Sequence, residues 1–394
     1  MRRTSRGLLA LATAVLLSGC GAAEALRPDP TWVPKPQGPP PADLPQPGPD
    51  QAPPGRGLPG QPGGPDAGTA DDPNVVATGL TLPWGLAVLP DGTALVGERT
   101  TGRLLQVQPQ RAPAKLLMRI PGLDTAGDGG LLGLALSPKY RQDELVYAYV
   151  TTRADNRVVR FTVGGAVTPV LTGIPRGRTG NGGRIAFGTD GTLYVATGDA
   201  GRPALAADRA SLAGKVLRVT AFGRPAPGNP DPASPVHSLG HGAVAGMCLS
   251  GSDQVYTTEP GTAAADEINR VERGRDYGWP TSGPAPRAGS AAPDRTLPAG
   301  RAGLAGCAVL ERGLFVAATT GQRLYALPLD NSGRPGMPAD FLAGAYGRLR
   351  TVVAGPEGAL WLTTSNKESG GKPTRQDDRV IRILPPAGST NSPA

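Results

Sequence analysis

The stretch RIAFGTDGTLYVATGDAG at residues 184–201 decides the fold. Apolar residues run through its two halves, and the turn residues Thr189, Asp190 and Gly191 separate them. Glycine supplies the positive φ that a tight hairpin turn requires, so the stretch predicts two antiparallel strands joined by a short turn. The preceding RTGNGG at 178–183 is a flexible, glycine-rich entry without an acid or a histidine, and it looks like the approach to a functional site.

The same strand–turn–strand pattern recurs along the chain. Further units start near residues 85, 133, 246, 305 and 351, which makes six units of roughly 35–60 residues with almost no helical periodicity. With 58 glycines and 44 prolines, the composition also favours many turns between short strands. We therefore predict an all-β, six-bladed β-propeller with four-stranded antiparallel blades, in which NVVATGL at 74–80 adds the closing strand of the last blade. A two-sheet sandwich is the alternative, and it explains the regular spacing less well.

The N-terminus predicts a lipoprotein signal. A basic MRRTSRG is followed by the short apolar run LLALATAVLL and by LSGC at 17–20. The apolar run is too short to span a bilayer as a stable helix, and a small-residue pair before cysteine matches the bacterial lipobox. We expect residues 1–19 to be a signal peptide and Cys20 to carry a lipid that holds the protein on the extracytoplasmic face of the cell membrane. An ordinary secretory signal with a chance cysteine is the alternative.

Composition divides the remaining chain. Residues 20–73 are rich in proline and glycine and predict a disordered spacer, 74–385 form the propeller, and 386–394 are a disordered tail. Formal net charge is +8, and about +5 without the leader's arginines, with no basic run interleaved with aromatics, so nucleic-acid binding is not expected. Beyond Cys20, Cys248 and Cys307 remain, and we predict a disulfide between them in an oxidising compartment, with two buried thiols as the alternative.

Several motifs occur in an order that resembles the glucose/sorbosone dehydrogenase family, the soluble quinoprotein sugar dehydrogenases. They are LPWGLAVLPDGTALVGERTTGRL, GDGGLLGLALSPKY, NGGRIAFGTDGTLYVATGD, LAGKVLRV, SLGHGAVAGM, ADEINRVERGRDYGWP and GRLRTVVAGPEGALWL. The likeness covers about residues 75–385, and DEIN followed by YGWP is its most specific part. The lipobox, the spacer and PALAADRASLAGKVLRV are most similar to the mycobacterial LppZ-type lipoproteins.

The resemblance implies a propeller with pyrroloquinoline quinone (PQQ) over the central channel, a calcium ion that polarises the quinone, and a histidine base. Here the position of that base is Gly180. The family's Arg-Asn pair after the histidine of GHRNPQG is replaced by Gly242 and Ala243, and its fifth-unit lysine falls near Thr320. The glutamine before GLLG corresponds to Asp128, a carboxylate that would oppose an anionic cofactor.

Other positions of the family pattern are kept. Arg348, Arg350 and His241 match cofactor-contacting positions, with Asp128 at a fourth, and Gly261, Thr262, Asp266 and Tyr277 lie where the family holds calcium. A backbone carbonyl ligand tolerates the change to threonine. The alternative is structural: DEIN, with Asp266 and Glu267, and YGWP, with Trp279, would lock the turn between blades, and Arg184 would donate hydrogen bonds between blades.

Three hypotheses about function follow. The first is a non-catalytic propeller that binds a carbohydrate, an envelope component or another protein at the channel mouth. Loss of a general base lowers a rate by about 10²–10⁴-fold, and the family's Arg-Asn pair and fifth-unit lysine are lost with it. The second is an active PQQ- and calcium-dependent sugar dehydrogenase in which Asp128 replaces the base. The third is an envelope scaffold with no ligand in the channel.

Overall fold

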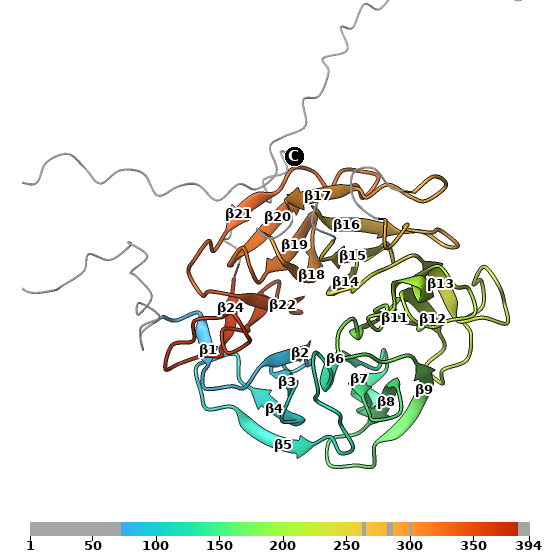
Figure 1. The fold of residues 1–394 in the computed structure, drawn as a ribbon. Coiled ribbons are helices and arrows are strands. Elements are labelled where there is room, and N and C mark those ends of the chain that lie inside the picture. Colours follow the sequence, from blue (N-terminus) through green and yellow to red (C-terminus); the bar gives the residue numbers. More distant parts are fainter. Residues whose placement is uncertain (1–71, 262–264, 282–286, 299–301, 385–394) are drawn as a thin grey trace, which may run out of the picture.

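A computed structural model describes residues 72–261, 265–281, 287–298 and 302–384. In this part of the chain, six four-stranded antiparallel sheets form a ring (Figure 1). This is the predicted six-bladed β-propeller, and the sandwich alternative is wrong. Cys20, the signal peptide, nearly all of the spacer, Thr262 and the tail at 386–394 lie outside the described residues.

We number the blades along the chain, each from its innermost strand outwards. Blade 1 contains β2 (Pro83–Val88), β3 (Ala94–Glu98), β4 (Arg103–Val107) and β5 (Lys115–Arg119). Blade 2 contains β6 (Leu131–Leu136), β7 (Val146–Thr151), β8 (Asn156–Phe161) and β9 (Thr168–Ile174). Blade 3 contains β10 (Gly182–Phe187), β11 (Leu193–Thr197), β12 (Lys215–Val219) and β13 (Val236–Leu239).

The second half of the ring follows the same order. Blade 4 contains β14 (Gly246–Leu249), β15 (Val255–Glu259), β16 (Ala265–Val271) and β17 (Arg295–Pro298). Blade 5 contains β18 (Leu304–Leu310), β19 (Gly313–Ala318), β20 (Arg323–Pro328) and β21 (Ala339–Phe341). Blade 6 contains β22 (Leu349–Ala354), β23 (Leu360–Thr364), β24 (Val380–Ile383) and, from the start of the domain, β1 (Val75–Ala77). The short helix α1 (Tyr140–Asp143) and the 3₁₀ turn η1 (Pro203–Ala206) lie in loops.

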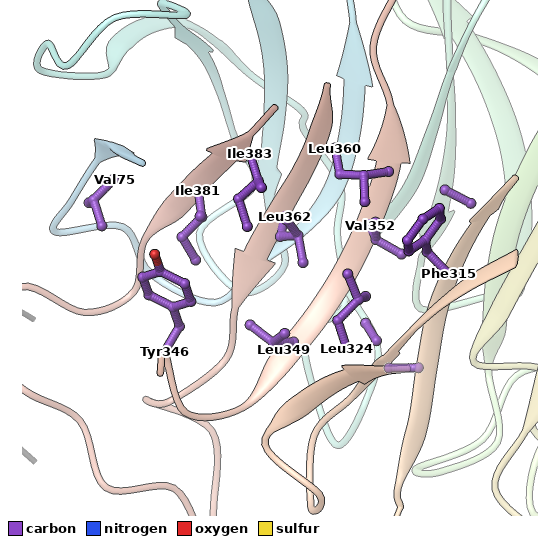
Figure 2. Close-up of a cluster of buried hydrophobic side chains, with 13 residues drawn as sticks. Val75, Phe315, Leu324, Tyr346, Leu349, Val352, Leu360, Leu362, Ile381 and Ile383 are labelled. Atoms are coloured by element: carbon purple, nitrogen blue, oxygen red, sulfur yellow. The ribbon is translucent and has the colours of Figure 1, made fainter. Parts of the chain in front are cut away.

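The ring closes through its first strand. β1 pairs antiparallel with β24, and Val75 lies opposite Ile381. The sequence therefore predicted the closing strand correctly. This pairing joins the two ends of the domain. Blade 6 also packs against blade 5 through a cluster of buried apolar side chains (Figure 2). This cluster includes Phe315 and Leu324 of blade 5 and Val352, Leu362 and Ile381 of blade 6.

Strand direction decides which loops share a face. In each antiparallel blade the innermost strand begins at the same end at which the second strand ends, so these two loops lie side by side at one face of the ring. The opposite face carries the hairpin turns, where Gly92, Gly191 and Gly358 have φ between +74° and +84° as the sequence predicted. We call the first face the channel mouth. It comprises the loops at 78–82, 99–102, 120–130, 152–155, 175–181, 198–214, 240–245 and 342–348, residues 260–261 after β15, the β19–β20 turn, and the loop at 365–379.

Candidate functional site: the channel mouth

The channel mouth gathers most of the residues that the sequence singled out. Asp128, Gly180, His241 and Gly261 lie in its loops, Arg348 precedes β22, and Arg350 is the second residue of that strand. Thr320 lies in the β19–β20 turn and is exposed. Topology alone brings these positions, which span more than 200 residues of sequence, to one face.

The position that the family resemblance assigns to a histidine base is occupied by a glycine. Gly180 has φ +70°, in the left-handed region, and a Cβ placed on it would lie 2.4 Å from Oδ1 of Asp199 and 3.0 Å from the backbone nitrogen of Gly201. Its carbonyl accepts a hydrogen bond of 2.8 Å from the backbone N–H of Ala200. The loop after β11 therefore fills the space that a side chain at 180 would need.

Asp128 lies directly against this loop. Its carboxylate accepts a hydrogen bond of 2.8 Å from the backbone N–H of Gly180 and a short one from Nδ2 of Asn181. Burial raises the pKa of Asp128, and these hydrogen bonds and the nearby Arg99 oppose that rise only in part. Asn181 is itself buried and is held by Asn156 and Gly177, so the acceptor and its donors form one rigid unit.

A buried arginine lies among the innermost strands, below the loops of the channel mouth. The buried Arg184 donates to the carbonyls of Ala245 at 2.7 Å and Arg350 at 3.2 Å and to Oγ1 of Thr351 at 3.0 Å. Its guanidinium lies 3.7 Å from the centroid of the Trp84 ring, and burial lowers its pKa to about 9. The cavity beside it, lined by all six innermost strands, is only about 60 Å³. Arg184 thus connects blades 1, 3 and 6 with the loop that leads into blade 4, and the cavity beside it has room for only a few waters.

Arg99, Arg350 and Glu368 meet at the mouth. Nη2 of Arg99 lies 3.7 Å from Oε1 of Glu368, and Arg350 forms a close ion pair with Oε2 of the same carboxylate. Arg99 also donates to the carbonyls of Gly127 and Gly129, in the loop that carries Asp128. Neither Arg99 nor Glu368 was among the site residues predicted from the sequence. Both lie in loops that follow the second strand of a blade, and this topological position was the available signal.

His241 lies beneath the mouth and is fully buried. Its Nδ1 is 2.7 Å from Oε1 of Glu259, its Nε2 is 2.8 Å from Oγ of Ser238, and its ring stacks on Tyr277 at 4.8 Å between centroids. Burial raises the pKa of Tyr277, whose hydroxyl donates to the carbonyl of Arg270 at 2.6 Å. Both ring nitrogens of His241 are thus engaged inside the protein, where they stabilise the segment that leads into blade 4.

The first position after His241 leaves no room for a longer side chain, because a Cβ on Gly242 would lie 2.7 Å from the Trp279 ring. The next residue, Ala243, pairs with Gly198 in an isolated bridge. Nε1 of Trp279 donates to Oδ2 of Asp199 at 2.9 Å. The indole therefore covers Gly242 and also fixes the carboxylate that lies against Gly180.

The predicted calcium positions are partly described. Gly261 and Asp266 are adjacent: Oδ1 of Asp266 accepts from the backbone N–H of Gly261 at 3.2 Å, and Oδ2 accepts from that of Leu304 at 3.2 Å. Tyr277 packs on His241 instead. Among the described residues no three His, Cys, Asp or Glu side chains group in a way that could hold a metal ion.

The predicted disulfide is present. Cys248 in β14 and Cys307 in β18 are bonded, with their Cα atoms 5.6 Å apart. The bond joins the innermost strands of blades 4 and 5, and Cys307 also lines the small channel cavity.

Comparison with known proteins adds to this geometry. The family model described as "Glucose / Sorbosone dehydrogenase" matches residues 80–372. The chain is 27% identical to quinoprotein glucose dehydrogenase B of Acinetobacter calcoaceticus, over 53% of this chain and 52% of that protein. It is 29% identical to the aldose sugar dehydrogenase YliI of Escherichia coli K12, over 51% of this chain and 59% of that protein. The chain thus spans only a little more than half the length of these curated relatives.

Solved structures match over a larger share of their chains. The PQQ-bound aldose sugar dehydrogenase of Streptomyces coelicolor is 43% identical with a TM-score of 0.75, over 78% of this chain and 95% of that one. A putative oxidoreductase (glucose dehydrogenase) of Thermus thermophilus is 39% identical with a TM-score of 0.73, over 79% of this chain and 98% of that one.

Proposed function

The chain belongs to the glucose/sorbosone dehydrogenase family, and within it we propose a non-catalytic, lipid-anchored member that binds a carbohydrate or another envelope component at the channel mouth. The observation that carries this proposal is the geometry of Gly180. The position that the family resemblance assigns to the histidine base has a left-handed φ, and Asp199 occupies the place of a side chain there. The conformation and packing of this loop thus require glycine at position 180, which supports a stable fold without a histidine base there.

The residues present do not fit PQQ as the family resemblance implies its binding. The cofactor is a tricarboxylate and needs cations that are free to pair with it. Here the carboxylate of Glu368 already pairs with Arg99 and Arg350, Asp128 adds a second carboxylate beside the mouth, and Trp279 covers Gly242. Each lost charged hydrogen bond weakens binding by about 1.5–3 kcal/mol, so several losses together oppose occupancy.

The location outside the cytoplasm rests on the N-terminal sequence. The basic start, the short apolar run and LSGC before Cys20 support processing by the lipoprotein pathway, and the resemblance to LppZ-type lipoproteins agrees with it. A disulfide between Cys248 and Cys307 is also typical of proteins outside the cytoplasm. In the described part of the chain, no helix is both long and apolar enough to cross a bilayer.

One observation favours an alternative, an active sugar dehydrogenase with Asp128 as its base. The Asp128 carboxylate lies 2.8 Å from the Gly180 nitrogen, beside the position of the missing histidine, and burial raises its pKa towards the range that a general base requires. Its lone pairs are directed at Gly180 and Asn181, however, and proton abstraction would compete with those hydrogen bonds.

The experiment that separates the two functions is reconstitution of the purified full-length protein with PQQ and calcium, followed by dye-linked oxidation of aldose sugars. The proposal predicts no saturable PQQ uptake and no turnover above the protein-free rate. Turnover that is lost in Asp128→Asn would establish the alternative. For the binding role, the immobilised protein is exposed to neutral saccharides and to cell-wall fragments, and retention that Trp279→Ala abolishes would place the ligand at the mouth.

A further inference from the structure

Glu368 is the only carboxylate of the described residues that forms ion pairs with two arginines of the channel mouth. Its side chain is 24% exposed, whereas the Arg99 and Arg350 side chains are 9% and 16% exposed. The two cations come from blades 1 and 6, which the ring closure brings together. A carboxylate of the protein thus occupies the place where a carboxylate of a ligand would pair with both.

The loop at 365–379 presents Glu368 in a fixed position. The backbone N–H of Glu368 donates to the carbonyl of Ser365 at 3.2 Å, and the carbonyl of Glu368 accepts from the backbone N–H of Gly371 at 2.8 Å. The buried Asn366 secures the start of the loop through hydrogen bonds to Asp377 and to the carbonyl of Tyr346. Little side-chain or backbone freedom has to be lost when the carboxylate meets the arginines, which favours the internal pair over a diffusing anion.

The arginines around Glu368 carry more charge than it neutralises. Arg350 lowers the pKa of both Arg99 and Arg184, so it is close enough to repel each of them, whereas Glu368 and Asp128 raise the pKa of Arg99. Within the described part of the chain, the buried Nε atoms of Arg348 and Arg350 have no hydrogen-bond partner. Partly desolvated cations with unused donors attract an anion, and removal of the internal counter-ion strengthens that attraction.

We propose that Glu368 acts as a built-in substitute for an acidic ligand, and that its charge determines specificity by excluding small polycarboxylates from the channel mouth. This inference rests on the proposed function, because it explains why a member of this family would leave an anionic cofactor unbound. It names the ligand class as well: the native mouth accepts uncharged, hydroxyl-bearing ligands in preference to carboxylate-bearing ones.

The test is calorimetric titration of full-length wild type and Glu368→Gln with citrate and with PQQ in low salt. The variant keeps the shape of the side chain and removes its charge, and we expect its affinity for both anions to rise about tenfold to a hundredfold, the range that one charge-assisted hydrogen bond provides. The matched control is Glu357→Gln. Glu357 also pairs with an arginine of blade 6, Arg382, at 3.0 Å, but in a turn of the opposite face, so this variant should bind like wild type.

Two further variants make the outcome decisive. Arg350→Gln added to Glu368→Gln should cancel the gain, and Glu368→Ala replaces Glu368→Gln if the latter does not show a cooperative melt. Unchanged anion affinity in a folded Glu368 variant would overturn the inference while leaving the proposed function intact. Tight PQQ binding with sugar turnover by wild type would overturn the proposed function instead.

Discussion

The carboxylate of Asp128 accepts a hydrogen bond from the backbone N–H of Gly180, and this 2.8 Å contact joins blade 2's entry loop to blade 3's. It holds the glycine in its left-handed conformation at the position that the family resemblance assigns to a base. The Asp199 carboxylate lies against the same glycine from the other side and is fixed by Trp279. Three substitutions relative to the family pattern, at 128, 180 and 242, therefore belong to one packed arrangement.

Gly180→Ala should destabilise the protein more than an equivalent change elsewhere. The left-handed conformation costs a non-glycine residue about 1–2 kcal/mol, and the new Cβ would also clash with Asp199. Gly191 is the matched control, because it has φ +78° and a Cβ placed on it would have nothing within 4 Å. Thermal melts should show a larger loss of Tm for Gly180→Ala than for Gly191→Ala, and equal losses would mean that the loop moves aside.

Asp128→Asn should change how stability depends on pH. The folded pKa of Asp128 is raised above 3.8, its ordinary value, chiefly by burial. A raised carboxyl pKa gives stability that is present below pH 3.8 and is lost as the pH rises through the folded pKa. Urea unfolding of both proteins is measured from pH 4 upward. The free energy of unfolding of the variant minus that of wild type should rise with pH and then become constant. A difference that falls with pH would contradict the burial argument.

Lys215 should give the opposite slope in the alkaline range. Its buried ammonium donates to the carbonyls of Leu205, Ala206 and Ala213, and burial lowers its pKa to about 8. The unfolded chain keeps this proton up to about pH 10.5, so stability should rise between pH 8 and 9.5, by at most about 1.4 kcal/mol per pH unit.

Lys215→Met removes both the titration and the three hydrogen bonds. It should lose this rise and cost about 2–4 kcal/mol at pH 7, because the carbonyls of Leu205, Ala206 and Ala213 lose their hydrogen bonds to the ammonium. Denaturant unfolding at each pH measures both effects. An unchanged slope in the variant would show that another group produces the rise.

Reduction of the disulfide should lower the stability of the fold. Cys248 and Cys307 are 59 residues apart and join two innermost strands, and such a crosslink contributes about 2–4 kcal/mol. The double variant Cys248→Ser/Cys307→Ser should melt at a lower temperature, and reducing agent should lower the Tm of wild type but not of the variant. Insensitivity of wild type to reductant under denaturing conditions would contradict the crosslink.

The fold could be predicted because its signals are local and repeated. Alternating apolar residues around a turn such as TDG indicate each hairpin. The segment NVVATGL at 74–80 could be identified as the strand that closes the last blade. The disulfide followed from two cysteines in similar strand contexts. The mouth could be predicted only in part, because Gly180 and Asp128 were visible as departures from a family pattern, whereas their hydrogen bond depends on tertiary packing.

Long-range charge contacts were beyond the sequence for the same reason. Arg99 and Glu368 are 269 positions apart, and nothing in GERTTG or NKESGG indicates that the two meet. His241 shows the converse: its motif suggested a cofactor contact, whereas Glu259 and Ser238, which fix its ring, became evident only from the folded chain. Which side chains contact one another depends on the direction in which each points in the folded chain, and the periodicity of the sequence does not specify that direction.

The most direct test of the central claim is a single-turnover measurement without dye. Full-length protein at high concentration is mixed with PQQ, calcium and an aldose sugar, and reduction of the quinone is followed by its absorbance. We expect the rate of the protein-free mixture, since no side chain at 180 can take the sugar's proton. A protein-dependent, sugar-saturable reduction would contradict it.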